Sequence, residues 1–214
     1  MRFQTVLFDV DGTLIHSSPG ILQTLRETFE RMGVDCSGFD LQQYLGPPLR
    51  RTFAQHFQDP EDVEKAVTLY RALYKESGQY ACRLFPGVEE MLRRLNEEGV
   101  LLCTATSKPA EVARPILEHL GIDRWFTIIG GAAMDSSLDT KTAVMRHVLC
   151  QPPVAGRPAL MVGDRRDDME GARNCGLPAA GVLYGYGTRQ ELEPYAPAFL
   201  APDCESLTKF ILES

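Results

Sequence analysis

Short, nearly continuous apolar runs recur along the chain and alternate with longer stretches in which apolar residues repeat at helical spacing. The runs are typical of strands covered on both faces, and the stretches are typical of amphipathic helices. The runs predict strands at residues 5–8, 100–105, 126–129, 159–162, 180–183 and 199–200. Helices are predicted at residues 87–98, 110–120, 141–150, 168–175, 189–195 and 205–212. This alternation predicts an α/β fold, a Rossmann-like parallel sheet with helices on both faces.

One segment, residues 16–83, interrupts the alternation. It carries helical patterns at 20–31, 49–57 and 61–77 and no strand pattern, and residues such as Leu25 and Phe29 repeat at the spacing of a helical core. We therefore predict an α/β core of residues 1–15 and 84–214, with an all-helical cap of residues 16–83 inserted after the first strand. Ligands of open α/β sheets bind at the carboxyl ends of the strands, so the cap is expected to cover the site and exclude water.

Composition narrows the classes of function. The 214 residues are 44% hydrophobic and 24% charged, which is typical of a soluble globular protein, and the net charge of −7 disfavours a nucleic-acid partner. No apolar run has membrane-spanning length, and no basic and apolar leader precedes the first strand, so we expect no membrane partner and a cytoplasmic protein. The six cysteines lie far apart without a Cys-x-x-Cys pair, which predicts free thiols.

Two aspartates, Asp9 and Asp11, end the first predicted strand and are followed at once by a glycine turn. Two carboxylates this close together at a strand end are costly unless positive charge lies between them. A divalent cation and a phosphoryl group are the candidates for that position. One carboxylate could then act as a nucleophile and the other as a general acid and base.

Polar residues also end the other central strands. Thr106 and Ser107 precede a helix whose first turn suits Pro109, and the free N–H groups of such a turn favour a phosphate. An ordinary helix cap explains the two hydroxyls equally well. Lys141 opens a helix, where a lysine opposes the helix dipole, although a solvated lysine is the commonest explanation for any single one. A lysine that holds phosphoryl oxygens against Asp9 would explain the placement.

Asp164 follows another strand and would complete an oxygen-rich pocket for a small cation. Mg²⁺ fits such a pocket because it needs few protein carboxylates and shares its other positions with waters and a phosphate oxygen. Asp168 lies in the first turn of the next helix, where an acidic residue is favourable in any case. We expect Asp168 to contact the residues that bind the metal without binding the metal itself.

Taken together, these strings resemble the motifs of the haloacid dehalogenase-like hydrolase superfamily, over essentially the whole chain. The matching positions, in motif order, are Asp9 to Leu14, Thr106, Lys141, and Gly163-Asp164 with Asp168. The helical insertion is similar to the first type of cap in that superfamily. Within it, the chain is most similar to the phosphoglycolate phosphatase-like branch, on the strings at residues 46–49 and 181–187.

The resemblance implies a phosphatase that hydrolyses a small phosphate monoester through an aspartyl-phosphate. Asp9 would attack phosphorus, and Asp11 would protonate the leaving alkoxide and then deprotonate the attacking water. Mg²⁺ would be held by Asp9, by the backbone carbonyl of Asp11 and by Asp164. Thr106 and Lys141 would bind the phosphoryl oxygens.

Two alternatives to hydrolysis stay open. A phosphomutase could pass the phosphoryl group to a sugar hydroxyl in place of water, and a catalytically silent binding protein could keep the same fold. A calcium-binding loop is rejected, because Thr13 and Leu14 stand where an EF-hand needs an oxygen ligand and a glycine.

Substrate choice is expected to lie in the cap and at the mouth of the site. Arg50, or Arg51 beside it, could bind a substrate carboxylate, although a solvated arginine is about as common at a helix start. His16 and Arg165 are further candidates, at positions where many relatives carry an aspartate and a small residue. The expected partner is a small phosphorylated metabolite, either phosphoglycolate or a nucleoside monophosphate, bound by a monomer or a homodimer.

Overall fold

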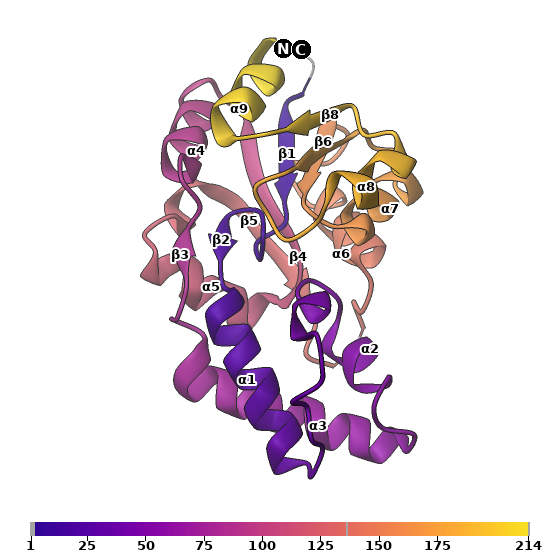
Figure 1. Cartoon of the computed structure of the whole chain (residues 1–214). Helices are drawn as coiled ribbons and strands as arrows, with labels where there is room; N and C mark the ends of the chain where they lie inside the picture. Colours follow the sequence, from indigo (N-terminus) through magenta and orange to yellow (C-terminus); the bar gives the residue numbers. More distant parts are fainter. Residues whose placement is uncertain (1–2, 136, 214) are drawn as a thin grey trace.

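A six-stranded parallel sheet forms the centre of the computed structural model, which describes residues 3–135 and 137–213 (Figure 1). In spatial order its strands are β5 (Phe126–Ala132), β4 (Leu101–Pro109), β1 (Thr5–Phe8), β6 (Ala159–Gly163), β7 (Ala179–Val182) and β8 (Phe199–Ala201). Every neighbouring pair is parallel. Strand β1 is therefore central, and its carboxyl end meets those of β4 and β6.

Helices cover both faces of the sheet, as the sequence predicts. One face carries α4 (Val88–Glu97), α5 (Ala110–His119) and α9 (Cys204–Glu213). The other carries α6 (Lys141–Leu149), α7 (Arg166–Asn174) and α8 (Arg189–Leu192). Short 3₁₀ turns, η3 (Asp123–Trp125) and η4 (Glu193–Tyr195), connect the layers. In β1 the side chains of Val6 and Phe8 pack into the first layer and Leu7 into the second, so the strand reads as one apolar run.

The cap lies beyond the carboxyl ends of the strands, in the lower part of Figure 1. Its helices are α1 (Ser18–Arg31), α2 (Leu49–Phe53) and α3 (Pro60–Leu73), with a 3₁₀ turn η1 (Leu41–Tyr44) and a π-helical turn η2 (Tyr74–Gly78). Phe29 is fully buried and meets the rings of Phe53 and His56 at centroid distances of 5.5 and 4.9 Å. These aromatic contacts give the cap its own core.

A short antiparallel ribbon joins the cap to the sheet domain. Strand β2 (Ile15–His16) pairs with β3 (Arg83–Leu84). The prediction that residues 16–83 contain no strand is wrong at both ends of that segment. A two-residue strand is too short to show a hydrophobic period. The two chain segments that connect the cap to the core therefore lie side by side, next to Asp11.

Several element boundaries also differ from the predicted ones. Strand β4 continues to Pro109, where it pairs with Ala132 of β5, and so runs past the predicted end at 105. Helix α7 begins at Arg166 because the Asp168 carboxylate accepts a hydrogen bond from the Arg165 N–H at 3.0 Å and so caps the helix. The third cap helix changes to π geometry at Tyr74. No helix in the described parts of the chain is long and apolar enough to cross a membrane.

Helix α1 and the π turn touch backbone to backbone. A Cβ atom added at Gly20 would lie 2.1 Å from the Gly78 carbonyl oxygen, and one added at Gly78 would lie 3.0 Å from the Gly20 carbonyl oxygen. Only glycine lets two backbones approach this closely. The widened turn of η2 thus lies directly against the first cap helix.

We expect Gly20→Ala to destabilise the protein by about 1–3 kcal/mol, the usual cost of overpacking a tight contact. The melting temperature should fall by about 2–4 °C for each kcal/mol in a protein of this size. Gly38→Ala is the matched control, because no atom lies within 4 Å of its added Cβ. Equal melting curves for the two variants would contradict the close contact.

Candidate active site

Lys141 is the central cation of a buried cluster at the carboxyl ends of β1 and β6. Its Nζ lies 2.8 Å from Asp9 Oδ1, 2.8 Å from Asp168 Oδ1 and 3.1 Å from the Ala105 carbonyl oxygen. Burial by itself lowers the pKa of Lys141, but Asp168 and Asp9 more than offset it, and the pKa lies above its ordinary value. Lys141 is therefore a permanent cation between two carboxylates.

Asp164 completes this cluster from the end of β6. Its carboxylate accepts hydrogen bonds from the Tyr186 N–H at 2.7 Å, the Gly187 N–H at 3.3 Å and the Thr13 hydroxyl at 3.3 Å. Burial, followed by the charges of Asp168 and Asp9, nevertheless raises the pKa of Asp164 to about 8. Three hydrogen bonds are thus not enough to compensate for the loss of water and the nearby negative charge.

The three aspartates form a cluster suited to a cation. One carboxylate oxygen from each of Asp9, Asp164 and Asp168 lies within 4.8 Å of the other two, and all three residues are buried. When ionised they carry three negative charges, against one positive charge on Lys141. The remaining excess of two in a buried place matches a divalent cation with oxygen ligands. The donor set therefore fits the predicted metal.

Glycines bring the backbone close to this cluster. Gly12 has a positive φ of 86°, and a Cβ added there would lie 2.3 Å from the Asp164 carboxylate. A Cβ at Gly163 would lie 2.2 Å from the carboxyl carbon of Asp168. The Asp-Gly turn after β1 and the Gly-Asp end of β6 thus let the two strand ends approach each other without steric overlap.

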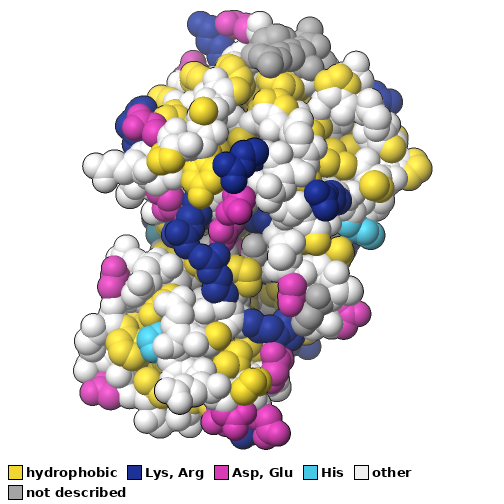
Figure 2. All heavy atoms as spheres, turned by 90° about the vertical axis from the view of Figure 1, so that its right-hand side faces the viewer, with side chains coloured by type: hydrophobic (Ala, Val, Ile, Leu, Met, Phe, Trp, Pro, Cys, Tyr) yellow, Lys and Arg dark blue, Asp and Glu magenta, His cyan; other side chains and the backbone are white. Residues whose placement is uncertain are grey.

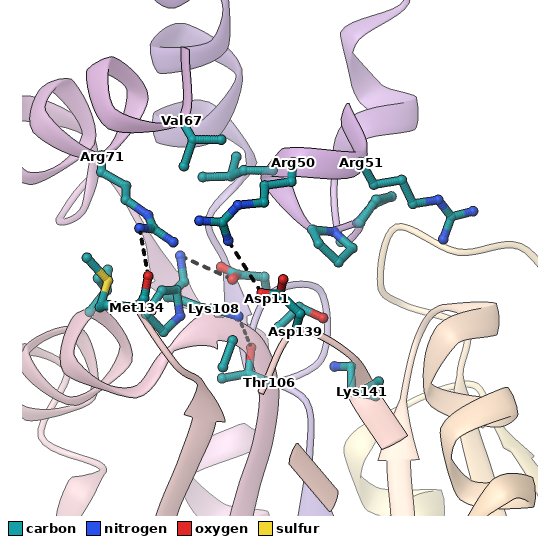
Figure 3. Close-up of a pocket in the computed structure, with 18 of the residues that line it drawn as sticks. Asp11, Arg50, Arg51, Val67, Arg71, Thr106, Lys108, Met134, Asp139 and Lys141 are labelled. Carbon is teal, nitrogen blue, oxygen red and sulfur yellow. Dashed lines mark hydrogen bonds and ion pairs between the residues drawn. The ribbon is translucent and has the colours of Figure 1, made fainter. Parts of the chain in front are cut away.

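Asp11 lies beside the cluster and has its own cation. Its Oδ2 is 3.1 Å from Nζ of Lys108, and its Oδ1 accepts a short hydrogen bond from the Ser17 hydroxyl. Lys108 is buried and also donates to the Tyr74 hydroxyl at 3.0 Å, with its Nζ 4.5 Å from the centre of that ring. In Figure 3 a dashed line joins the Lys108 ammonium to the Asp11 carboxylate beside it.

Lys108 is a candidate site residue that the sequence analysis missed. It lies two residues after Thr106 on β4, and both residues line the cavity. Lys108 directly follows the predicted pair Thr106 and Ser107, and this proximity in sequence is the signal that could have found it. Its backbone N–H also donates to the Thr106 hydroxyl at 3.2 Å, which holds the predicted phosphate-binding threonine in place.

The loop after β7 ties the core to the start of the cap. The Tyr186 hydroxyl accepts hydrogen bonds from the backbone N–H groups of Ser17 and Ser18, at 2.8 and 2.9 Å. Ser17 precedes α1 and contacts Asp11. The segment of residues 181–187 therefore makes two contacts. Its Tyr186 hydroxyl binds the start of the cap, and its Tyr186 N–H binds Asp164.

A cavity of about 1010 Å³ opens between cap and core. The predicted residues Asp9, Asp11, Thr106, Ser107 and Lys141 all line it. In Figure 2, basic and acidic side chains gather along the boundary where the two parts meet. The structure thus brings these five predicted residues together on one wall of a single cavity, whereas Asp164 and Asp168 are fully buried and do not belong to its lining.

Two cap arginines also line the cavity, both in ion pairs. Arg50 contacts Glu64 at 2.5 Å and reaches the core residue Asp139 at 3.4 Å. Arg51 lies 3.4 Å from Asp167. These arginines hold the cap against the core as well as facing the cavity (Figure 3).

The structure does not bring His16 and Arg165 to the cavity wall formed by the described residues. The His16 ring packs against the ring of Phe85, at a centroid distance of 5.6 Å. Arg165 donates to the Leu45 carbonyl oxygen at 2.6 Å and pairs with Glu191 at 2.9 Å. Both residues join cap to core outside the cavity, a placement that their position near the motifs could not reveal.

The comparison with known proteins identifies the family. Residues 6–182 match the family model described as haloacid dehalogenase-like hydrolase. The chain belongs to this family. A solved structure, a predicted phosphatase from Clostridium acetobutylicum, superimposes with a TM-score of 0.93 at 33% identity, covering 100% of both chains. The predicted superfamily and fold class are confirmed.

Several relatives of this hydrolase are named for an activity. The chain is 36% identical to a 5'-nucleotidase of Pseudomonas aeruginosa, over 100% of this chain and 97% of that one. It is 29% identical to a phosphoglycolate phosphatase of Pseudomonas savastanoi, over 94% and 77%. It is 38% identical to the tyrosine-protein kinase PtkA of Mycobacterium tuberculosis, over 86% of this chain and 63% of that one. The predictions of the phosphoglycolate phosphatase-like branch and of a phosphatase-type enzyme are confirmed.

The raised pKa of Asp164 leads to a prediction about stability and pH. Without metal, the folded protein keeps this proton up to about pH 8, whereas an unperturbed aspartate loses it near 3.8. Over this range the folded state binds more protons than the unfolded state, so the free energy of unfolding falls as pH rises. Mg²⁺ competes with the proton for the same carboxylates and should therefore stabilise the protein more at pH 8 than at pH 5.

Melting temperatures between pH 5 and pH 8, with a chelator and with Mg²⁺, test this expectation. Asp164→Asn is the matched variant, because the amide mimics the protonated acid and removes the part of the fall with pH that comes from Asp164, together with most of the Mg²⁺ effect. Burial also raises the pKa of Asp168 to about 7, so part of the fall remains in this variant. The assignment of the raised pKa to Asp164 would be contradicted by one result in the presence of the chelator. In that result, the melting temperature of wild type relative to that of Asp164→Asn does not fall between pH 5 and pH 8.

Proposed function

We propose that the protein is a Mg²⁺-dependent phosphatase that hydrolyses a small phosphate monoester through an aspartyl-phosphate on Asp9. The observation that carries this proposal is the cavity wall on which Asp9, Asp11 and Lys141 lie together, with Lys141 Nζ 2.8 Å from Asp9. A nucleophile, an acid and a fixed cation on one surface are the parts that phosphoryl transfer needs.

The reaction proceeds in two displacements at phosphorus. In the first, a carboxylate oxygen of Asp9 forms a bond to phosphorus while the ester P–O bond breaks, and Asp11 gives its proton to the leaving alkoxide. In the second, Asp11 takes a proton from a water whose oxygen attacks phosphorus, and the carboxylate of Asp9 leaves. Lys141 and Thr106 hold the phosphoryl oxygens through both steps.

The contacts of Asp11 hold its carboxylate in place. Nζ of Lys108 lies 3.1 Å from Asp11 Oδ2. The short hydrogen bond from Ser17 orients the carboxylate. Both contacts are made by buried groups, so water does not compete for them.

The residues that would hold Mg²⁺ are Asp9, Asp164 and the backbone carbonyl of Asp11, with Asp168 next to them. When bound, the ion neutralises charge so that an anionic carboxylate can approach an anionic phosphoryl group. Asp168 keeps Lys141 in place through its 2.8 Å contact.

The cavity supports a leaving group of nucleoside size. Its volume of about 1010 Å³ matches the upper end of clefts that enclose drug-sized ligands, about 300–1,000 Å³, whereas glycolate has only a few heavy atoms. The rings of Tyr70, Tyr74 and Tyr80 belong to its lining. Similarity over the full chain to a 5'-nucleotidase supports the same choice. A nucleoside monophosphate is therefore the substrate class we propose, ahead of phosphoglycolate.

Phosphate release from a panel of monoesters tests the function. Nucleoside monophosphates, phosphoglycolate and sugar phosphates should be compared with Mg²⁺ and with a chelator. We expect metal-dependent release that falls by at least about 10⁴-fold in Asp9→Asn, because the nucleophile is lost. Asp35→Asn is the control, since this exposed aspartate of the cap lies outside the cavity lining.

Full activity of Asp9→Asn would refute the mechanism. Interconversion of sugar phosphates without release of free phosphate would favour a phosphomutase. Binding of a monoester without any turnover would favour a catalytically silent protein.

The role of Asp11 can be tested with p-nitrophenyl phosphate, whose leaving group needs no proton. In Asp11→Ala the first displacement should survive and the second should slow, because no base activates the water. We expect a burst of p-nitrophenol that approaches one equivalent per active site, followed by turnover about 10²–10⁴-fold slower than in wild type. Slow release without a burst, at the same rate for alkyl and aryl esters, would contradict this role.

A further inference from the structure

Arg71, in the last turn of α3, lacks a strong partner among the described residues. It lines the cavity, and its buried Nε has no hydrogen-bond partner there. Its Nη1 donates to the Met134 carbonyl oxygen at 3.4 Å, a long contact for a charged donor. No carboxylate of the described residues lies within ion-pair distance of Arg71, although Arg50 and Arg51 beside the same cavity are both paired.

The sequence around Arg71 offers no partner along the helix. The residues four positions before and after it are Val67 and Lys75, so neither can form the usual ion pair across one turn. Arg31 at the equivalent last turn of α1 has Glu27 at 2.5 Å, four positions earlier. Glu64, an acidic residue whose charge acts on Arg71, has one carboxylate oxygen 2.5 Å and the other 3.0 Å from Arg50.

The electrostatics of this position favour an incoming anion. Burial and the neighbouring charge of Arg50 lower the pKa of Arg71 below its ordinary value, although the charges of Glu64, Asp139 and Glu111 act in the opposite direction. A partly buried cation without an ion pair among the described residues is unfavourable, and a bound anion would relieve it. Figure 3 shows Arg71 and Arg50 extending from the cap towards the cavity, above the wall that carries Thr106 and Lys141.

We propose that Arg71 binds a second anionic group of the substrate, so that among nucleotides and other phosphate monoesters the cavity prefers those whose leaving group carries a carboxylate or another phosphate. The planar guanidinium can donate two parallel hydrogen bonds to either group. This inference rests on the proposed function, because it places the reacting phosphoryl group at Asp9 and Lys141. Arg71 then determines specificity and takes no part in the chemical steps.

Matched substrate pairs distinguish the two sources of the second anion. Ethyl phosphate and 2-phosphoglycolate test a carboxylate. Adenosine 5'-phosphate and adenosine 3',5'-bisphosphate test a second phosphate. In each pair kcat and KM should be measured for wild type, Arg71→Met and Arg71→Lys, with p-nitrophenyl phosphate as a reference that has no second anion. Arg31→Gln is the control, a cap arginine outside the cavity lining.

In wild type we expect the doubly anionic member of one pair to have the lower KM, and the pair that shows it identifies the anion. Arg71→Met should raise that KM by about 10- to 100-fold, the usual loss for a hydrogen-bonded charge pair, with kcat nearly unchanged. Arg71→Lys should recover part of the affinity. Hydrolysis of p-nitrophenyl phosphate should stay within about twofold in both variants, since the reacting group is untouched.

Calorimetric binding of the same pairs to Asp9→Asn keeps the inference independent of turnover. The doubly anionic ligand should bind more tightly to Asp9→Asn, and combining this change with Arg71→Met should remove the preference. Absence of a preference in both pairs, or an equal effect of Arg71→Met on both members of a pair, would overturn the inference. Absence of phosphate release from every compound would instead refute the proposed phosphatase.

Discussion

The structure depends on an excess of negative charge that the fold keeps out of water. Asp9, Asp164 and Asp168 meet at the carboxyl ends of β1 and β6, and Lys141 supplies one positive charge among them. Backbone N–H groups and the absence of a side chain at Gly12 hold the carboxylates close together. Such an arrangement is unfavourable alone and is relieved by a divalent cation, so the three carboxylates favour the binding of such an ion.

The second constraint is the way in which the cap is attached around Asp11. Ser17 at the start of α1 and Lys108 from β4 contact its two oxygens, and Lys108 also reaches Tyr74 at the other end of the cap. Tyr186 binds the backbone at Ser17 from the core. A movement of the cap therefore changes the surroundings of Asp11, the proposed acid and base.

The core and the cap divide the tasks of chemistry and recognition. The core wall contains the groups that any phosphate monoester would meet, and relatives named for different substrates share this family fold. The cap wall contains aromatic rings, the paired Arg50 and Arg51, and Arg71, which has no ion pair among the described residues. Because a fold does not determine a substrate, the cap side chains are the part of the cavity that we propose selects it.

The sequence by itself determined the parallel sheet, the helical cap and the family, since hydrophobic periods and contiguous motifs are local properties. The residues of the core site were also predictable, because the carboxyl ends of parallel strands must meet at one edge. Their catalytic roles remain predictions. Only the tertiary structure decided the partners of Lys108 and the lack of an ion pair for Arg71 among the described residues. It also decided that His16 and Arg165 lie outside the cavity. The reason is physical: each depends on side chains from elements far apart in the sequence, whose contacts packing alone establishes.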